Sequence, residues 1–328
     1  MISASIVLFN TKKEDLEVVI KSFAPQAGRE LFLIDNSGKR DISLEHKIES
    51  VNKQAYMQMR TGQTVSVKTA FMENVSGLNA SAKNVAEKNA SDKTFTWEKA
   101  AGHIKYIYNG KNLGYGSAHN IGIRMAIEMN SDYHVVLNPD LKFEPYVIDE
   151  LEKYADANKD VVYMMPKVLN PDGNIQYLCK LLPTPQDLIF RRFLPKTKNA
   201  LKKNALYELR CFGYKYDKII NPPCLSGCFM FMRVSALKKY NLFFDEKYFM
   251  YCEDFDLMRR LHRIGKTVFY PEVSVIHNHA KESYHDRKMM RIHIRSAIRY
   301  FNKFGWIFDK ERKAENSKIL SEIYKKNM

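Results

Sequence analysis

The sequence predicts an α/β fold, in which a mostly parallel sheet is flanked by helices and followed by a basic helical extension. The first indication is a strand, helix, strand succession within the first forty residues, because parallel neighbours need a crossover helix between them. The second is a series of short apolar runs that end in polar turns, such as residues 133–137 before Asn138, Pro139 and Asp140. The third is the basic, aromatic stretch after residue 286, where apolar residues recur at helical spacing.

Composition sets the broad class. Of 328 residues, 45% are hydrophobic and 27% are charged, which predicts a globular core. No apolar run approaches the roughly 18 residues that a membrane span needs. The five cysteines lack the spacing of a disulfide framework, so we expect buried, reduced thiols in a cytoplasmic protein. The net charge of +15 favours an anionic partner, which could be nucleic acid, a membrane surface or a phosphorylated substrate.

The first half of the sheet is expected from strands at residues 4–9, 30–35 and 104–109. A helix should follow the first strand, with Thr11 and Glu14 as a capping box. Residues 41–103 are polar and break the pattern, so we interpret them as an insertion at the edge of the sheet, with no role assigned. Residues 112–122 place glycines at a strand-to-helix turn. Such a turn can bind an anion through its amides or can serve tight packing, and both interpretations stay open.

The second half should contain strands at residues 133–137, 161–166 and 224–233, and helices at 146–155 and 235–240. A further helix is expected from residue 253, and Gly265 should end it. The next strand, from residue 266, should end at Pro271. Residues 287–308 are predicted to form a helix that suits either a membrane interface or packing on the domain with a solvated basic face.

Asp140 follows a buried strand, and ligands of open α/β sheets bind where the strands end. It could therefore meet a metal or a phosphate, although Asn-Pro-Asp is also an ordinary turn sequence. Near the C-terminus, His277 and His279 flank an asparagine at a strand end, which makes a metal ligand plausible.

Three acids, Glu253, Asp254 and Asp256, lie together in an apolar and aromatic stretch. Acids at a helix start complement the helix dipole, which accounts for one or two of them. Apolar surroundings also raise the pKa of a carboxyl group, which suits a general base.

The motifs follow one another in a specific order, although none is decisive alone. They are Ile34-Asp35-Asn36-Ser37; Asn112-Leu113-Gly114-Tyr115-Gly116 with Asn120-Ile121-Gly122; Leu137-Asn138-Pro139-Asp140; Gly227 before Met232-Arg233; Phe244-Asp245-Glu246 with Tyr248-Phe249; Glu253-Asp254-Phe255-Asp256-Leu257 with Arg260; and Pro271 before His277. In this order they resemble glycosyltransferase family two, especially the rhamnosyltransferase-type members that build bacterial surface polysaccharides. The resemblance covers most of residues 4–40 and 104–305.

The resemblance implies a GT-A fold over residues 1–285, with residues 286–328 as a basic helical extension. It implies transfer of rhamnose or a hexose from dTDP-rhamnose or a UDP-hexose to a glycan or lipid-diphosphate-linked acceptor. Because a single base without a covalent nucleophile is present, the anomeric carbon should be inverted. The basic tail could dock at the inner face of the cell membrane.

The resemblance also implies roles for individual residues. Asp254 would be the base, and Glu253 and Asp256 would lie on the acceptor side. Mg²⁺ or Mn²⁺ would be held by Asp140 and His277, with Asn138 in place of the first acid of an Asp-x-Asp motif. The nucleotide-sugar contacts would be Phe9, Asn10, Asp35, Asn112, Gly114, Asn138, Asp140 and Arg260.

Three other classes can be compared with this interpretation. A nucleic-acid-binding protein leaves the acid cluster unexplained, and a dehydrogenase would need the glycine fingerprint that is missing here. A non-catalytic GT-A scaffold or nucleotide-sugar-binding protein is the serious alternative, because the metal motif has lost one acid. The enzyme interpretation requires Asp140 and Asp254 to converge on one cleft.

Overall fold

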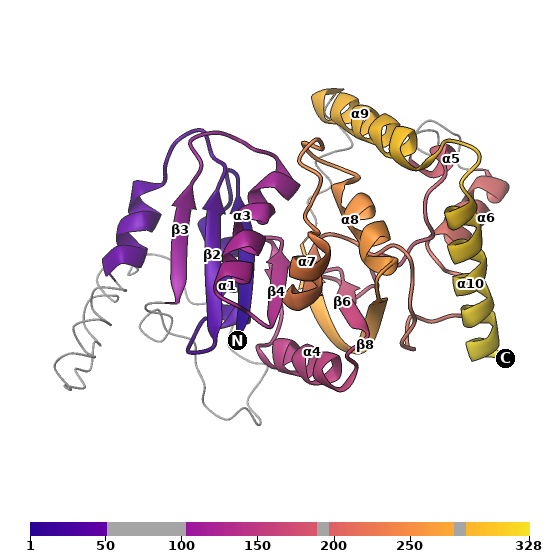
Figure 1. The fold of residues 1–328 in the computed structure, drawn as a ribbon, viewed down its shortest axis with the longest axis horizontal. Helices are drawn as coiled ribbons and strands as arrows, with labels where there is room; N and C mark the ends of the chain where they lie inside the picture. The colour runs from indigo at the N-terminus through magenta and orange to yellow at the C-terminus, as the bar shows by residue number, and fades with distance from the viewer. Residues whose placement is uncertain (51–102, 189–196, 279–286) are drawn as a thin grey trace.

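The computed structural model describes residues 1–50, 103–188, 197–278 and 287–328. Within them, eight strands form one sheet in the order β3-β2-β1-β4-β7-β6-β8-β5 (Figure 1). Strand β7 is antiparallel to both of its neighbours and β5 is antiparallel to β8, whereas the other strands run in one direction. The predicted mostly parallel sheet is confirmed. The strands are β1 (Ile2–Leu8), β2 (Arg29–Asp35), β3 (Ile104–Tyr108), β4 (Tyr133–Leu137), β5 (Leu141–Lys142), β6 (Val161–Leu169), β7 (Phe229–Arg233) and β8 (Lys266–His277).

Helices cover both faces of the sheet. In β2, Phe32 and Ile34 pack with α3, whereas Leu31 and Leu33 belong to the core cluster that contains the apolar side of α1. This alternation is what a strand buried on both faces requires. The helices are α1 (Lys13–Phe23), α3 (Tyr115–Glu128), α4 (Tyr146–Ala157), α5 (Pro185–Leu188), α6 (Lys198–Tyr207), α7 (Val234–Tyr240), α8 (Glu253–His262), α9 (Arg287–Phe304) and α10 (Lys310–Asn327).

Three local predictions are wrong, and the first concerns the helix expected over residues 287–308, which ends at Phe304. Thr11 does not cap α1, because its hydroxyl accepts a hydrogen bond from the amide of Phe9 (3.2 Å) and the helix begins only at Lys13. Pro271 does not end its strand, since β8 continues to His277. A shift in the pairing register with β6 next to this proline accommodates it.

Part of the predicted insertion is described. Residues 42–50 are helical, whereas residues 51–102, like His279, lie outside the described residues. All five cysteines are free, as predicted; four are buried and Cys211 is half-buried.

The C-terminal helices pack on the rest of the chain. Helix α9 buries Ala297, Tyr300 and Phe301 in an apolar cluster with Tyr248 and Cys252, and α10 contributes to the main core. Packing on the domain therefore accounts for one face of α9. Across the described ranges, none of the helices combines the length and the apolar character that crossing a bilayer requires.

Candidate active site

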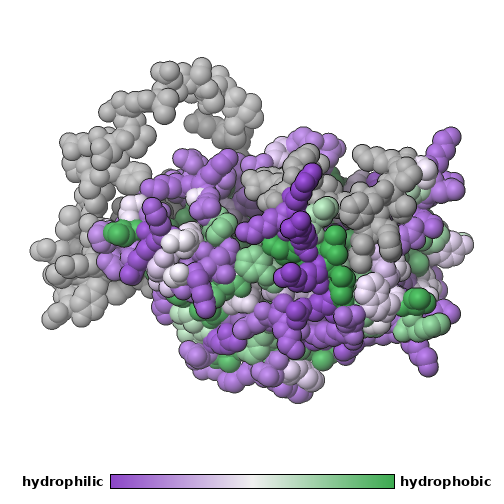
Figure 2. All heavy atoms as spheres, turned by 90° about the horizontal axis from the view of Figure 1, so that it is seen from above, coloured by the Kyte–Doolittle hydropathy of each residue, from purple (hydrophilic) through white to green (hydrophobic). Residues whose placement is uncertain are grey.

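The parallel strands end on the side of the molecule that Figure 2 views from above, and hydrophilic and hydrophobic residues both lie on that face. Asp140 follows β4 on this side, and His277 ends β8. Because Leu141 pairs with His277 in the β5–β8 ladder, the two residues are adjacent. Asp140 Oδ1 lies 3.3 Å from His277 Nε2. The expected metal pair is thus brought together by sheet pairing.

Gln176 fixes the tautomer of His277. Its Nε2 donates to the carbonyl of His277 (2.8 Å) and to Asn170 Oδ1 (2.9 Å), so its Oε1 must be the atom that faces His277 Nδ1 at 3.0 Å. Nδ1 therefore carries the proton, and the lone pair of Nε2 points toward Asp140 and the amide of Asn138 (3.2 Å). This is the arrangement that prepares an imidazole to bind a metal.

Asp140 and His277 fit a site in which a divalent cation is bound jointly by the protein and by the diphosphate of a substrate. Among the described residues, no group of three or more His, Cys, Asp or Glu side chains is placed to bind a metal. Asp140 and His277 would thus supply two ligands. Mg²⁺ and Mn²⁺ are commonly held by one or two protein ligands together with substrate phosphates and water. The Oδ1 atom of Asn138, which replaces the first acid, is within hydrogen-bond distance of the Tyr115 hydroxyl (3.0 Å).

Asp254 lies in the first turn of α8. Its Oδ2 accepts from the amide of Gly227 (3.2 Å) and its Oδ1 from the amide of Phe255 (2.9 Å). Burial raises the pKa of Asp254, and the positive charge of Lys180 opposes that increase. The pKa of the neighbouring Glu253 is also raised, by burial and then by Asp254. A carboxylate with a raised pKa in a fixed orientation can act as a general base.

The backbone before α8 is strained. Tyr251 and Cys252 are consecutive non-glycine residues with φ of 69° and 66°, a region that side chains rarely adopt. Cys252 is 2% exposed within the apolar cluster packed by α9, so a small buried side chain fits here. Glu253, which follows, is 5% exposed, and its Oε2 has no hydrogen-bond partner among the described residues.

Tyr115 connects the two acid sites. Its hydroxyl lies 3.0 Å from Asn138 Oδ1 and 2.8 Å from the carbonyl oxygen of Gly227, whose amide binds Asp254. Burial raises the pKa of Tyr115, and the charges of both Asp254 and Asp140 raise it further. The charges of the two acids therefore act on one side chain, and their convergence on one cleft stays a prediction.

The glycine turn before α3 serves close packing. Gly114 has a φ of 86°, and a Cβ there would lie 2.1 Å from the carbonyl oxygen of Phe249. Its amide donates to Asn112 Oδ1 (2.9 Å), and the amide of Tyr115 donates to Phe249 (3.1 Å). These two amides are engaged within the protein, so the anion interpretation of this turn is not supported. We leave Asn112 and Gly114 out of the proposed site for this reason.

A cavity of about 670 Å³ opens where β1 and β2 end. Asn10 and Asp35 line it, and its three lysines (Lys13, Lys39 and Lys47) are balanced by three acids (Glu17, Asp35 and Asp41). Asp35 is 1% exposed and accepts hydrogen bonds from the amide of Ser37 (2.8 Å) and from Tyr106. Phe9, which is 52% exposed, comes directly before Asn10 in the chain.

Asp256 and Arg260 pair with each other. Asp256 is fully buried, and its carboxylate binds Arg260 (2.6 Å) and Lys303 of α9 (2.5 Å). Arg260 also donates to the carbonyl oxygen of Phe243 (2.6 Å). These contacts join α8 to α9 and to the loop before α8. We therefore exclude Asp256 from the acceptor side and Arg260 from the nucleotide contacts.

Sequence reasoning assigned no role to Tyr115, Gln176 or Lys180. Tyr115 lay inside a glycine motif, and Gln176 follows a turn with no motif of its own. The ammonium of Lys180 lies 5.6 Å from the centre of the Phe255 ring, and its charge acts on Asp254. Only the spatial proximity of separate segments shows these roles, so the sequence alone carried no signal for them.

Comparisons with known proteins show what the chain is similar to. The sequence model of the family described as "Glycosyl transferase family 2" matches residues 88–240. The chain is 29% identical over 200 residues to an N-acetylglucosaminyl-diphospho-decaprenol L-rhamnosyltransferase of Mycobacterium tuberculosis, over 56% of this chain and 62% of that protein. It is 28% identical over 205 residues to the rhamnosyltransferase WbbL of Escherichia coli, over 60% of this chain and 73% of that protein.

Among solved structures, S. aureus TarS is similar with a TM-score of 0.50 and 12% identity, over 99% of this chain and 43% of that chain. This likeness concerns the fold and agrees with the predicted GT-A class. The chain spans 62% of the length of the mycobacterial relative, and the family match ends before Asp254 and His277. The predicted resemblance is nevertheless confirmed over residues 88–240, which match the model of glycosyl transferase family 2.

Proposed function

We propose that the protein is an inverting, metal-dependent glycosyltransferase. It would move rhamnose or a hexose from a nucleotide-diphosphate donor to a glycan or lipid-linked acceptor. The observation that carries the proposal is the meeting of three segments around Tyr115. Asp140 and His277 lie at the end of β4 and β8, and Asp254 lies at the start of α8.

In this proposal Asp254 removes the proton from the acceptor hydroxyl. The acceptor oxygen then bonds to the anomeric carbon, the bond to the diphosphate oxygen breaks, and the nucleoside diphosphate leaves with the electron pair. The two backbone hydrogen bonds to Asp254 hold its carboxylate in place, and burial gives it the basicity for this step. Because the chain uses no covalent nucleophile here, one displacement inverts the configuration.

The leaving group carries negative charge that must be neutralised. A divalent cation bound by Asp140 and Nε2 of His277 would supply this neutralisation. Gln176 would keep the imidazole in the tautomer with a free Nε2 lone pair. The cavity with Asn10, Asp35 and three lysines would receive the nucleotide.

The donor and the acceptor are proposed from the relatives. Both bacterial relatives are named rhamnosyltransferases, which favours dTDP-rhamnose over a UDP-hexose as the donor. The mycobacterial relative is named for a diphospho-decaprenol acceptor, which favours a lipid-diphosphate-linked acceptor and bacterial surface polysaccharide synthesis. Such an acceptor would require a cytoplasmic protein to work at the surface of the membrane.

A thermal-shift screen tests the donor and the cation together. Purified protein is heated with dTDP-rhamnose, UDP-hexoses or GDP-sugars, each with and without Mn²⁺. A donor at a hundred times its Kd adds about 2.7 kcal/mol of stability, so the preferred nucleotide should stand out. Release of nucleoside diphosphate is then followed with the preferred donor.

Two variants sharpen the test. Asp140→Ala should lose the Mn²⁺-dependent part of the thermal shift, whereas Asp172→Ala, at an exposed turn, should keep it. If no nucleotide sugar shifts the melting curve, the enzyme proposal fails. A donor that binds but is never cleaved, with or without acceptor, would favour the non-catalytic scaffold instead.

A further inference from the structure

The turn between α9 and α10 presents three consecutive large hydrophobic side chains to solvent. Trp306 is 38% exposed, Ile307 77% and Phe308 94%. Single exposed hydrophobic residues are ordinary, but a contiguous group of them marks a contact surface. We call residues 306–308 the apolar tip.

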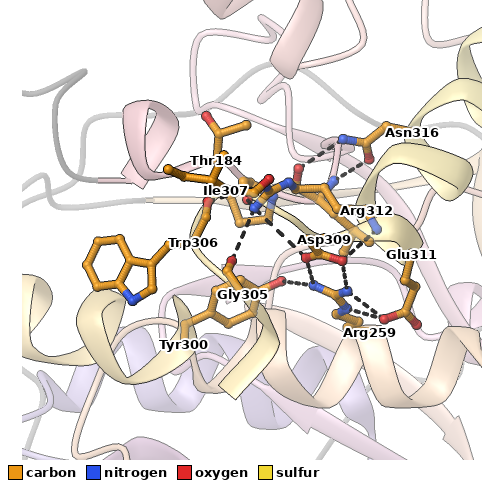
Figure 3. Close-up of polar contacts among 12 residues, drawn as sticks. Thr184, Arg259, Tyr300, Gly305, Trp306, Ile307, Asp309, Glu311, Arg312 and Asn316 are labelled. Carbon is orange, nitrogen blue, oxygen red and sulfur yellow. Dashed lines mark hydrogen bonds and ion pairs between the residues drawn. The ribbon is translucent and has the colours of Figure 1, made fainter. Parts of the chain in front are cut away.

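The apolar tip stands on a buried ionic frame (Figure 3). Arg312, only 8% exposed, donates to the carbonyl oxygens of Trp306 (3.3 Å) and Ile307 (3.1 Å). Asp309 accepts from the amide of Arg312 (2.9 Å) and binds both terminal nitrogens of Arg259 (2.7 and 2.6 Å). The backbone of the tip is therefore fixed in place, and little ordering entropy is lost when it binds a partner.

The same frame reaches the helix that carries Asp254. Arg259 belongs to α8 and is 2% exposed. In α9, the Ser296 hydroxyl donates to the carbonyl oxygen of Met250 (2.8 Å), just before α8. Helix α9 lies on the side of the molecule where β2 and β3 end (Figure 1). A surface bound by the tip would thus be held in a fixed relation to the acceptor side of the cleft.

Basic residues outnumber acids around the tip, where Asp309 and Glu311 are both paired with arginines. Helix α9 contains no Asp or Glu, and exposed Lys310 and Lys313 follow the tip in α10. Near an anionic lipid surface, each Lys or Arg contributes about 1 kcal/mol. The basic residues of α9 are Arg287, Lys288, Arg291, Arg295, Arg299 and Lys303.

We propose that the apolar tip docks this protein on an anionic lipid surface. Ile307 and Phe308 enter the boundary between headgroups and acyl chains, while the basic side chains of α9 and α10 face the headgroups. Three side chains cover far less than the roughly 800 Å² per partner of a stable protein interface, whereas an aromatic and basic mixture suits a membrane interface. The inference rests on the proposed function, because a lipid-linked acceptor would be presented at that surface.

Vesicle co-sedimentation tests the inference without any turnover. The full chain is mixed with phosphatidylglycerol vesicles or with phosphatidylcholine vesicles, at low and at high salt. Wild type should bind the anionic vesicles, and salt should weaken that binding. The double variant Ile307→Ser/Phe308→Ser should bind them at least about tenfold more weakly. Tyr240→Ser, which removes an exposed aromatic ring (46% exposed) from α7, should bind as wild type does.

Other outcomes would overturn the inference. Wild type that ignores anionic vesicles, or a double variant that binds like wild type, would remove the lipid surface as the partner. If light scattering without vesicles instead detected a dimer in wild type that the double variant loses, the tip would be assigned to a contact with a second copy of the chain. The donor-induced thermal shift of the double variant should equal that of wild type. The donor test and the vesicle test can therefore fail independently.

Discussion

Replacing Asp254 by asparagine distinguishes its proposed role as a general base from its role in stabilising the fold. Both carboxylate oxygens accept backbone amides, one from Gly227 and one from Phe255. Asparagine has a single acceptor oxygen, so one of these amides would face an NH₂ group. A buried donor left without an acceptor costs about 1–3 kcal/mol. Loss of a general base lowers the rate by about 10²- to 10⁴-fold. We therefore expect kcat to fall by that factor and the free energy of unfolding to fall modestly.

The assay measures kcat, the Kd of the donor and urea unfolding for the same preparations. Donor affinity should stay near that of wild type, because the nucleotide is expected at the cavity lined by Asp35. Asp256→Asn is the matched control, since it weakens buried ion pairs to Arg260 and Lys303 in the same helix. It should lose stability and keep kcat. An Asp254→Asn protein that turns over within about threefold of wild type, or an Asp256→Asn protein equally inactive, would refute the base assignment.

Three further predictions follow from the site and the core. Gln176→Leu should weaken Mn²⁺ binding about ten- to a hundredfold in calorimetry with the nucleoside diphosphate present, because nothing then fixes the tautomer of His277; an unchanged titration contradicts this. Lys180→Met should move the acid limb of the kcat/KM profile to higher pH, because the charge that lowers the pKa of Asp254 is lost. An acid limb that stays in place or moves to lower pH would contradict this electrostatic effect of Lys180 on Asp254. Burial lowers the pKa of His134 to about 3, so the unfolded state binds more protons between pH 3 and 6.5. Stability should therefore fall as the pH drops through that range, by about 2 kcal/mol at pH 5 from this group. His134→Gln should flatten the slope measured by urea unfolding, and an equally steep slope would show that other groups cause it.

The sheet was predictable because its signals are local. Apolar runs such as residues 133–137 and 161–166 are too short and too β-branched for helices, and polar turns bound them. The incorrect predictions arose where a contact in the folded structure outweighed a rule that depends on the local sequence. Pro271 lies within β8 because a register shift accommodates it, and Thr11 binds back to the end of its own strand.

The candidate site was predictable only where a motif named it. Asp140 follows a strand and His277 ends one, so their meeting followed from the expected topology, whereas Asp254 was named by its motif alone. Tyr115 and Gln176 act through contacts between segments that are far apart in sequence, which no periodicity reports. The acceptor-side role of Asp256 was predicted from a cluster of acids whose members look alike in sequence. In the structure Asp256 is set apart because it is fully buried and paired with Arg260.

Strand β7 runs antiparallel to both of its neighbours, and this direction places Gly227 between Asp254 and Tyr115. Had this five-residue strand run in the same direction as its neighbours, its first residue would lie about 13 Å away, at the opposite end of the strands. Instead, the chain enters β7 beside the end of β4, and one residue, Gly227, binds Asp254 through its amide and Tyr115 through its carbonyl oxygen. In the proposed mechanism, a change in the backbone conformation of Gly227 would disturb proton removal and leaving-group binding together. Substitutions in this short entry segment should therefore affect both halves of the reaction at once.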